Sequence, residues 1–177
     1  MECWSVEKLE EISKMKKSLI LIIVLVWLMA LFFIYGELVP DFSLKKMDGS
    51  AFKLSDYLGK KIIVIDFWAT WCKPCKKLLK KLNEIHLDYK DKVEVITIST
   101  DDASAFSKIE SYIKGKRYSF MVLLDPDSSV SRIFNPSEQL PFTLIIDKKG
   151  NIAYTHTGYM PGYEKELIKK IEKLSHD

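Results

Sequence analysis

The chain has 177 residues, which is enough for one ordinary globular domain with an appendage. Hydrophobic residues make up 47% of it and charged residues 29%, a balance that argues against general disorder. The net charge of +3 is too small to indicate nucleic-acid binding, so we expect no nucleic-acid partner and regard the scattered lysines as a solvated surface.

An apolar run, residues 18–36, lies near the N-terminus and contains no charged residue. As a helix it would be about 28 Å long, close to the roughly 30 Å hydrocarbon core of a bilayer. Apolar side chains fill it on every side, which is not the pattern of an amphipathic surface helix. We therefore expect a retained transmembrane anchor in contact with membrane lipid. A cleaved signal peptide is the alternative, although no small-residue cleavage pattern follows the run.

The basic residues around this run indicate its orientation. Lys14, Lys16 and Lys17 precede it, whereas residues 37–44 contain no Lys or Arg. The positive-inside rule then predicts a short cytoplasmic tail, residues 1–17, and an extracytoplasmic domain, residues 37–177. The protein would be a single-pass protein of the cytoplasmic (inner) membrane. Cys3 would be an incidental residue of the tail, across the membrane from the other two cysteines.

Beyond the run, strand-like and helix-like stretches alternate along the chain. Strands are predicted at 51–54, 61–68, 93–99, 119–124, 143–147 and 151–157, and helices at 72–89, 103–113, 128–134 and 163–174. The last two strands are joined across a Lys-Lys-Gly turn and read as a hairpin. The pattern predicts an α/β fold with a central mixed β-sheet and helices on both faces.

Two of the three cysteines, Cys72 and Cys75, follow the buried strand 61–68 and open the next helix. Unpaired N–H groups and the positive end of the dipole at a helix N-terminus stabilise a thiolate, and Lys73 adds positive charge. Two intervening residues let the second thiol reach back one helical turn. We expect a redox pair in which Cys72 attacks and Cys75 resolves the mixed disulfide.

The pair has two other interpretations. A zinc half-site needs further Cys or His ligands, and His86, His156 and His176 are scattered along the chain. A purely structural disulfide is the second alternative. We expect no metal and, since the chain lacks a Gly-rich phosphate loop, no cofactor.

Asp66 places a carboxylate in the otherwise apolar end of strand 61–68. Burial of a carboxylate is costly unless it is paired or its pKa rises, and a raised pKa would suit a proton acceptor for Cys75. The alternative is an aspartate at the strand's end that reaches water.

Leu140-Pro141 precedes another apolar strand, where proline is normally excluded. A cis peptide bond there would give a fixed backbone edge beside the cysteines. The alternative is an ordinary loop proline.

Residues 38–174 resemble the thioredoxin superfamily, in particular its membrane-anchored TlpA/ResA-like branch. The motifs that carry the resemblance are Pro40-Asp41-Phe42, Asp48-Gly49, Leu54-Ser55-Asp56, Gly59-Lys60, Trp71-Cys72-Lys73-Pro74-Cys75, Leu123-Leu124-Asp125-Pro126, Leu140-Pro141 and Ile145-Ile146-Asp147. The resemblance implies a thioredoxin-like fold, with Pro141 as the cis-proline and Leu140 offering its backbone to a substrate chain. We assign Trp71, Lys73 and Pro74 to the same substrate-binding surface.

The chain departs from that branch at three positions. Leu78 and Lys80 stand where the branch often carries Glu and Pro, and Asp66 stands where it often has Asn. Asp66 is therefore expected to replace the acid–base assistance that the absent Glu would give.

The resemblance implies a thiol–disulfide oxidoreductase that reduces extracytoplasmic protein disulfides, apocytochrome c or its maturation partners among them. Electrons would come from a membrane thiol donor of the CcdA or DsbD kind. An oxidant or isomerase for secreted proteins is an alternative, because Lys73 stabilises the thiolate and hence the reduced form. Less favoured are a thiol peroxidase, whose usual P-x-x-x-T-x-x-C context is missing, and a redox-inactive binding module using the Leu140-Pro141 edge.

Overall fold

A computed structural model of the chain describes residues 3–34 and 38–176, and describes side chains for residues 10–27 and 38–176. The chain divides into two compact units, Met1–Glu37 and Leu38–Asp177.

The described part of the first unit is one helix, α1 (Cys3–Ile34). Every side chain from Leu19 to Trp27 is apolar and at least 50% exposed. Among the described residues, no helix is long and apolar enough to cross a membrane. The side chains of residues 28–36 of the predicted anchor lie outside the described part. The predicted transmembrane helix therefore stays a prediction.

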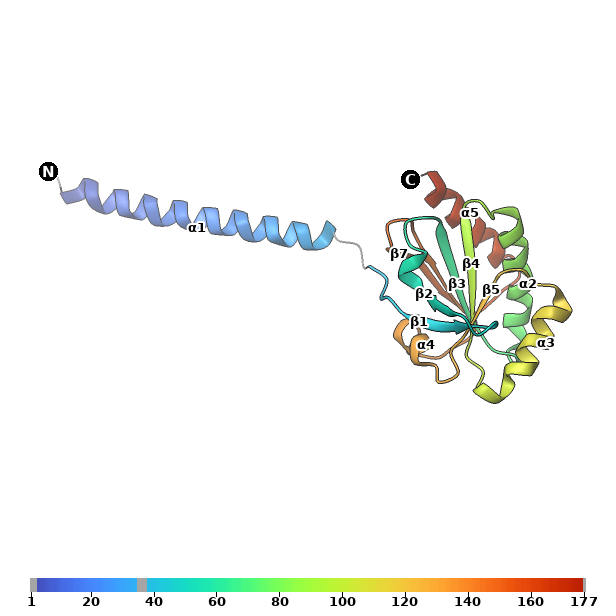
Figure 1. Ribbon diagram of the computed structural model, residues 1–177. Coiled ribbons are helices and arrows are strands. Elements are labelled where there is room, and N and C mark those ends of the chain that lie inside the picture. The colour runs from blue at the N-terminus through green and yellow to red at the C-terminus, as the bar shows by residue number, and fades with distance from the viewer. Residues whose placement is uncertain (1–2, 35–37, 177) are drawn as a thin grey trace. The chain divides into compact units, whose positions relative to one another are not determined.

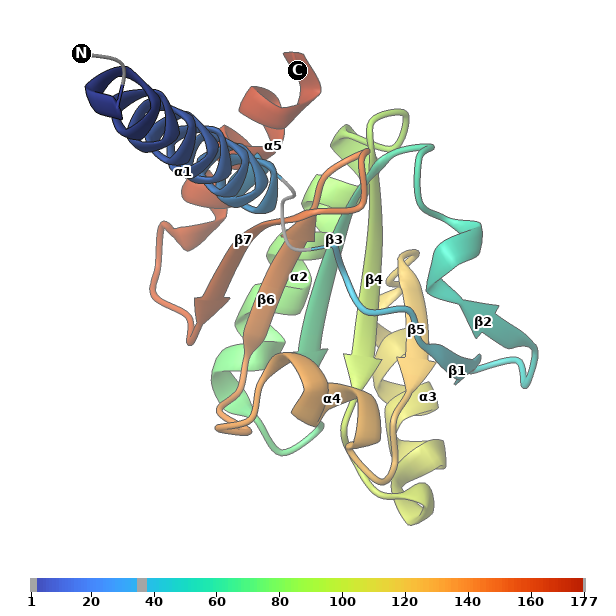
Figure 2. The ribbon, with the colours of Figure 1, turned by 90° about the vertical axis from the view of Figure 1, so that its left-hand side faces the viewer.

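The second unit is built on one seven-stranded sheet with the order β2-β1-β5-β4-β3-β6-β7, which can be followed in Figure 2. Its strands are β1 (Ser43–Lys46), β2 (Ala51–Lys53), β3 (Ile62–Trp68), β4 (Val93–Ser99), β5 (Met121–Leu124), β6 (Phe142–Ile146) and β7 (Ile152–Thr157). The three central strands β3, β4 and β5 are parallel, and both edges are closed by antiparallel pairs. The predicted mixed sheet is confirmed.

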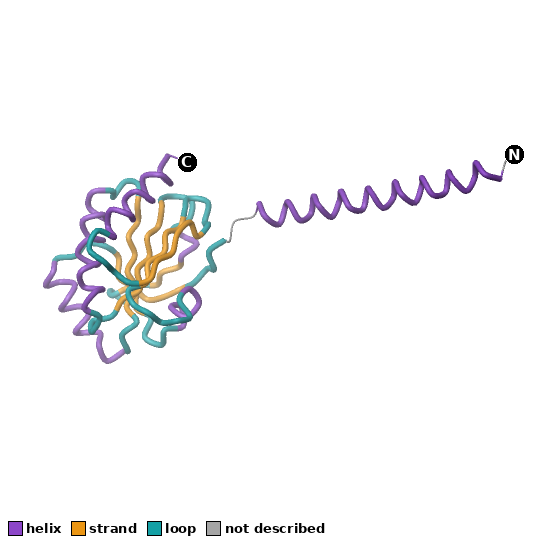
Figure 3. The backbone as a smooth tube through the Cα atoms, turned by 180° about the vertical axis from the view of Figure 1, so that it is seen from behind, coloured by secondary structure: helices purple, strands orange, loops and turns teal. Residues whose placement is uncertain are grey.

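Helices cover both faces of this sheet, as predicted (Figures 1 and 3). Three helices pack on one face: α2 (Lys73–Asp88), α3 (Phe106–Lys116) and α5 (Tyr163–His176). The opposite face carries α4 (Ser129–Phe134), the short 3-10 turn η1 (Leu54–Asp56) and the chain segment 39–42. A second 3-10 turn, η2 (Ala103–Ala105), leads into α3.

Alternation along β3 divides the apolar core into two layers. Ile62, Val64 and Trp68 belong to the layer under α2, α3 and α5. Ile63, Ile65 and Phe67 belong to the layer under α4. Because successive side chains of a strand point to opposite faces, all seven residues of β3 are buried, which explains its nearly continuous apolar sequence.

Strand β1 is absent from the sequence prediction. Its four residues contain a single apolar side chain, Leu44, so neither an alternating nor a continuous apolar pattern marks it. The strand forms because it pairs with β2 on one side and with β5 on the other. The predicted helix 103–113 also differs, since it divides into η2 and α3 and ends where Arg117 adopts φ 55°.

Candidate active site

Cys72 and Cys75 form a disulfide at the N-terminus of α2, with their Cα atoms 5.3 Å apart. Cys72 is the N-cap of the helix, and its Sγ accepts a hydrogen bond from the backbone N–H of Cys75 at 3.2 Å. An N–H group that would otherwise be unpaired at the helix end therefore points at this sulfur. Such a donor favours negative charge on Sγ.

The two cysteines differ in access to solvent. Cys75 is fully buried, whereas Cys72 keeps 4% of its surface exposed. Around Cys72 the neighbouring side chains are open: Trp71 is 68% exposed, and Lys73 and Pro74 are exposed as well. Pro74 lies in the first helical turn, where its missing N–H costs no hydrogen bond. A partner approaching the disulfide therefore meets Cys72 and an exposed indole first.

The loop before Cys72 is held by a buried aspartate, Asp101. Its carboxylate accepts hydrogen bonds from the backbone N–H and the hydroxyl of Thr70, both at 2.7 Å, and from the hydroxyl of Ser99 at 2.8 Å. The N–H of Thr100 donates to the carbonyl of Trp68 at 2.9 Å. The end of β4 thus fixes the loop that carries Cys72. Asp101 was not predicted from the sequence, where its only signal is that Thr100, Asp101 and Asp102 form a polar cluster directly after a buried strand.

Asp66 is fully buried in β3. In the alternation of that strand it lies between Val64 and Trp68, so its side chain faces the core layer that contains Cys75. Oδ1 accepts a hydrogen bond from the Thr143 hydroxyl at 2.8 Å, and Oδ2 has no partner among the described residues. Burial raises the pKa of Asp66 well above its ordinary value. The expected buried carboxyl is confirmed, and the alternative of an aspartate reaching water is wrong.

The peptide bond between Leu140 and Pro141 is cis, as expected. Pro141 is buried, and its carbonyl accepts a hydrogen bond from the N–H of Gly158 at 2.7 Å. The next residue, Phe142, pairs with Phe67 of β3. This register places Pro141 at the carboxyl end of β3, the end from which the chain continues toward Cys72.

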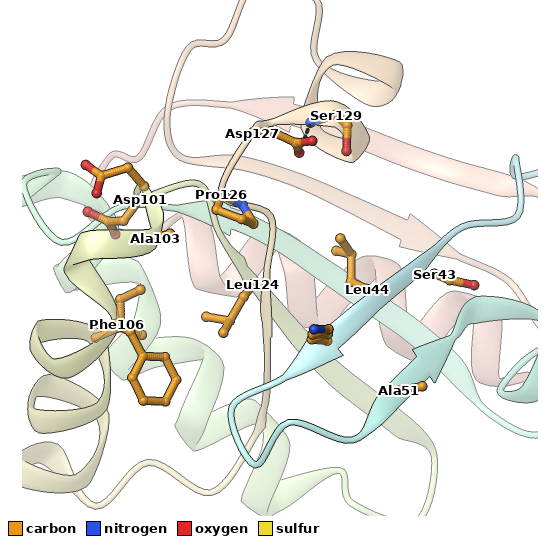
Figure 4. A pocket seen from close by; sticks show the side chains of 13 residues that line it. Ser43, Leu44, Ala51, Asp101, Ala103, Phe106, Leu124, Pro126, Asp127 and Ser129 are labelled. Carbon is orange, nitrogen blue, oxygen red and sulfur yellow. Dashed lines mark hydrogen bonds between the residues drawn. The ribbon is translucent and has the colours of Figure 1, made fainter.

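A groove of about 710 Å³ is lined in part by Asp101 (Figure 4). Its wall is largely apolar and includes Leu124 and Phe106, and in this view Asp101 stands at one end and Ala51 at the other. The carboxylates at its rim already accept hydrogen bonds, Asp102 from the N–H of Ser104 and Asp127 from the N–H of Ser129.

Comparison with known proteins places this geometry in a family. The sequence model of the AhpC/TSA family matches residues 35–155. The chain belongs to the AhpC/TSA family. The thioredoxin-like protein YneN of Bacillus subtilis is 33% identical over 138 residues, 77% of this chain and 78% of that protein. The thiol-disulfide oxidoreductase ResA of Geobacillus kaustophilus is 32% identical over 140 residues, 78% of this chain and 77% of that protein.

Solved structures agree with this assignment. A thioredoxin-like protein from Porphyromonas gingivalis has a TM-score of 0.67 and 33% identity, and covers 80% of this chain and 95% of that one. The pneumococcal exposed lipoprotein thioredoxin of Streptococcus pneumoniae has a TM-score of 0.64 and 28% identity, and covers 76% of this chain and 99% of that one. The fold is thioredoxin-like, and this AhpC/TSA-family member is a thiol–disulfide oxidoreductase of the ResA type with a Cys72–Cys75 pair.

Proposed function

We propose that this oxidoreductase reduces disulfides of extracytoplasmic proteins, with Cys72 as the attacking and Cys75 as the resolving thiol. The observation that carries the proposal is the position of Cys72. Sγ of Cys72 accepts a hydrogen bond from the N–H of Cys75 at the start of α2. Of the two cysteines, only Cys72 has exposed surface. The accessible cysteine is thus also the one whose thiolate the helix end stabilises.

The exchange moves two electrons from the pair to the substrate. The Cys72 thiolate attacks one sulfur of the substrate disulfide, forms a mixed disulfide and displaces the first substrate thiolate. The Cys75 thiol then loses its proton and attacks Sγ of Cys72, which releases the second substrate thiolate and leaves the Cys72–Cys75 disulfide. Asp66, buried on the same side of the sheet as Cys75, is the proposed proton acceptor for this second step.

The substrate is proposed to lie across the exposed rim of the pair. Trp71, Lys73 and Pro74 offer open side chains on one side, and Leu140 with Pro141 offers a backbone edge on the other. Apocytochrome c or its maturation partners are the proposed substrates, and a membrane thiol donor of the CcdA or DsbD kind would restore the dithiol.

We further propose that residues 18–36 anchor the chain in the cytoplasmic membrane with the second unit outside. The uncharged run and the exposed apolar side chains from Leu19 to Trp27 support this, because so much apolar surface is unfavourable in water. Recovery of the full chain in the soluble fraction of lysed cells would contradict the anchor.

Substitution of each cysteine tests the order of attack. We expect Cys72→Ser to abolish exchange, and Cys75→Ser to accumulate a mixed disulfide between Cys72 and the substrate, visible on non-reducing gels. Cys3→Ser is the matched control and should leave the rate of exchange unchanged. Trapping by Cys72→Ser instead of Cys75→Ser would reverse the assigned roles.

The same variants separate the alternatives. A binding module would keep its cellular function when both Cys72 and Cys75 are changed to Ser. A thiol peroxidase would consume hydrogen peroxide at a rate far above that of exchange with protein disulfides. An oxidant or isomerase is distinguished by the reduction potential of the Cys72–Cys75 pair, which for a strong oxidant lies near about −120 mV.

A further inference from the structure

A second hollow, of about 650 Å³, lies between α2 and α3. We call it the lysine groove and define it by Lys76, Lys77, Lys80, Lys116, Tyr112 and Tyr118. It has no part in the proposed redox chemistry, and it is separate from the proposed substrate contacts at Trp71, Lys73, Pro74, Leu140 and Pro141.

The positive charge of the lysine groove is uncompensated. Among the described residues, none of its four lysines forms an ion pair, whereas neighbouring lysines on the same two helices do: Lys81 pairs with Glu84 and Lys114 with Glu110. Within the part of the chain that the structure describes, Glu84 is the one acidic residue that lines the groove, and it pairs with Lys81. Four lysines against one glutamate leave an excess of three positive charges in the lining. The groove thus carries a local excess of positive charge.

Aromatic rings give the groove a fixed shape. Nζ of Lys76 lies 5.2 Å from the ring centroid of Tyr112, within cation–π distance. Tyr112 and Tyr118 pack edge to face with their centroids 6.2 Å apart. Below them, Oδ1 of Asn83 accepts the backbone N–H of Ser119 at 2.9 Å and ties α2 to the segment after α3. The lysine groove is therefore a hollow with an aromatic wall rather than a flat charged face.

The groove begins beside the redox pair. Lys76 directly follows Cys75, and its N–H donates to the carbonyl of Cys72 at 3.3 Å. From Lys76 to Glu84 the helix rises about 12 Å, at roughly 1.5 Å per residue. That length matches about four residues of an extended peptide at roughly 3.3 Å each. A chain whose cysteine meets Cys72 can therefore place a neighbouring segment along the groove.

We propose that the lysine groove binds a short acidic segment of the protein whose disulfide is reduced. The proposal rests on the proposed function, because it makes the occupant part of the same substrate. Uncompensated ammonium groups attract carboxylates, and the two tyrosine rings offer apolar contact to a polypeptide. An anionic bilayer would meet the lysine heads but would not enter the hollow between two helices, which favours a peptide as the occupant.

Binding is tested on the oxidised full-length chain in a non-ionic detergent. The probes are two fluorescent peptides without cysteine, identical except for four Glu or four Ser residues, followed by fluorescence anisotropy. We expect the Glu peptide to bind about tenfold more tightly, and this advantage to disappear in about 1 M NaCl, where the screening length is roughly 3 Å.

The double variant Lys77→Glu with Lys80→Glu should lose the advantage, because both ammonium groups become like charges toward the probe. The matched control is Lys165→Glu with Lys169→Glu, two exposed lysines on α5, which should keep it. Equal binding of the two peptides to the unaltered chain, or equal loss in both double variants, would overturn the proposal. So would an effect of the groove variant on vesicles of anionic lipid without any effect on the peptides.

A rate measurement links the groove to the chemistry. The dithiol form should reduce a disulfide flanked by four Glu about tenfold faster than the same disulfide flanked by four Ser, and the groove variant should remove this ratio. Equal rates for both substrates would overturn the groove as a substrate site. Failure to reduce either one would instead contradict the proposed function, and the anisotropy result would still decide whether the groove binds acidic peptide.

Discussion

Two aspartates near the redox pair are buried, yet their surroundings give them different roles. The carboxylate of Asp101 accepts hydrogen bonds from Thr70 and Ser99, so its charge is matched by donors. The carboxyl of Asp66 has one hydrogen bond, from Thr143, and one oxygen without a partner among the described residues. The first arrangement stabilises a loop, whereas in the second burial raises the pKa of the carboxyl.

Asp66 should make the stability of the chain depend on pH. Burial raises its pKa in the folded chain, whereas in the unfolded chain the pKa lies near 3.8. Above about pH 4 the unfolded chain releases a proton that the folded chain keeps, so the free energy of unfolding falls as pH rises toward the folded pKa. Asp66→Asn removes this loss, and we expect it to raise the free energy of unfolding by about 1–3 kcal/mol at pH 8 and by less at pH 4.

Urea denaturation at both pH values measures this difference, with the exposed substitution Asp91→Asn as the control. The same Asp66→Asn variant should slow exchange at neutral pH, because the proposed acceptor for the Cys75 proton is gone. A variant that is equally stabilised at both pH values would refute the titration of Asp66. Unchanged exchange kinetics would remove Asp66 from the mechanism.

Helices and strands with a regular apolar spacing can be predicted from the sequence. The spacing of Leu78, Leu79, Leu82 and Ile85 identifies α2, and all four side chains are buried against the sheet. The apolar run of β3 likewise predicts a strand buried on both faces. The cysteine pair, the buried Asp66 and the cis bond before Pro141 follow from residue types that are anomalous in their local context.

Features that depend on residues far apart in the sequence cannot be predicted from local patterns. Strand β1 exists through pairing with β5, whose Leu124 lies opposite Lys45 far along the chain. Asp101 acts on Thr70 across 31 residues, and nothing in either local segment indicates the contact. The lysine groove likewise arises only when α2 and α3 lie side by side, because single lysines along a sequence indicate no more than a solvated face.

The contact between Asp101 and the loop predicts a loss on substitution. Asp101→Ala would leave the N–H and hydroxyl of Thr70 buried without an acceptor, and we expect the free energy of unfolding to fall by about 2–4 kcal/mol. Exchange should slow as well, because the loop that positions Cys72 is no longer fixed. Asp102→Ala, an exposed neighbour, is the control and should cost about 1 kcal/mol or less. Similar losses in the two variants would contradict a specific role for Asp101.

The function of the whole molecule depends on the direction in which electrons flow between the Cys72–Cys75 pair and its substrate. The N-cap position of Cys72 and the nearby Lys73 stabilise the thiolate, which by itself makes the pair more oxidising. The proposed reductase therefore requires that these effects be modest beside the stability of the Cys72–Cys75 disulfide. The proposed membrane thiol donor would be needed only if the pair works as a reductant.

The reduction potential of the Cys72–Cys75 pair in the full chain tests this claim most directly. It is measured by equilibration with glutathione or dithiothreitol buffers. The Cys3→Ser variant is used, so that Cys72 and Cys75 are the only cysteines in the chain. We expect a potential near or below about −230 mV, in the range of thiol–disulfide reductants. A potential near about −120 mV would mean a strong oxidant and would contradict the proposed direction of electron flow.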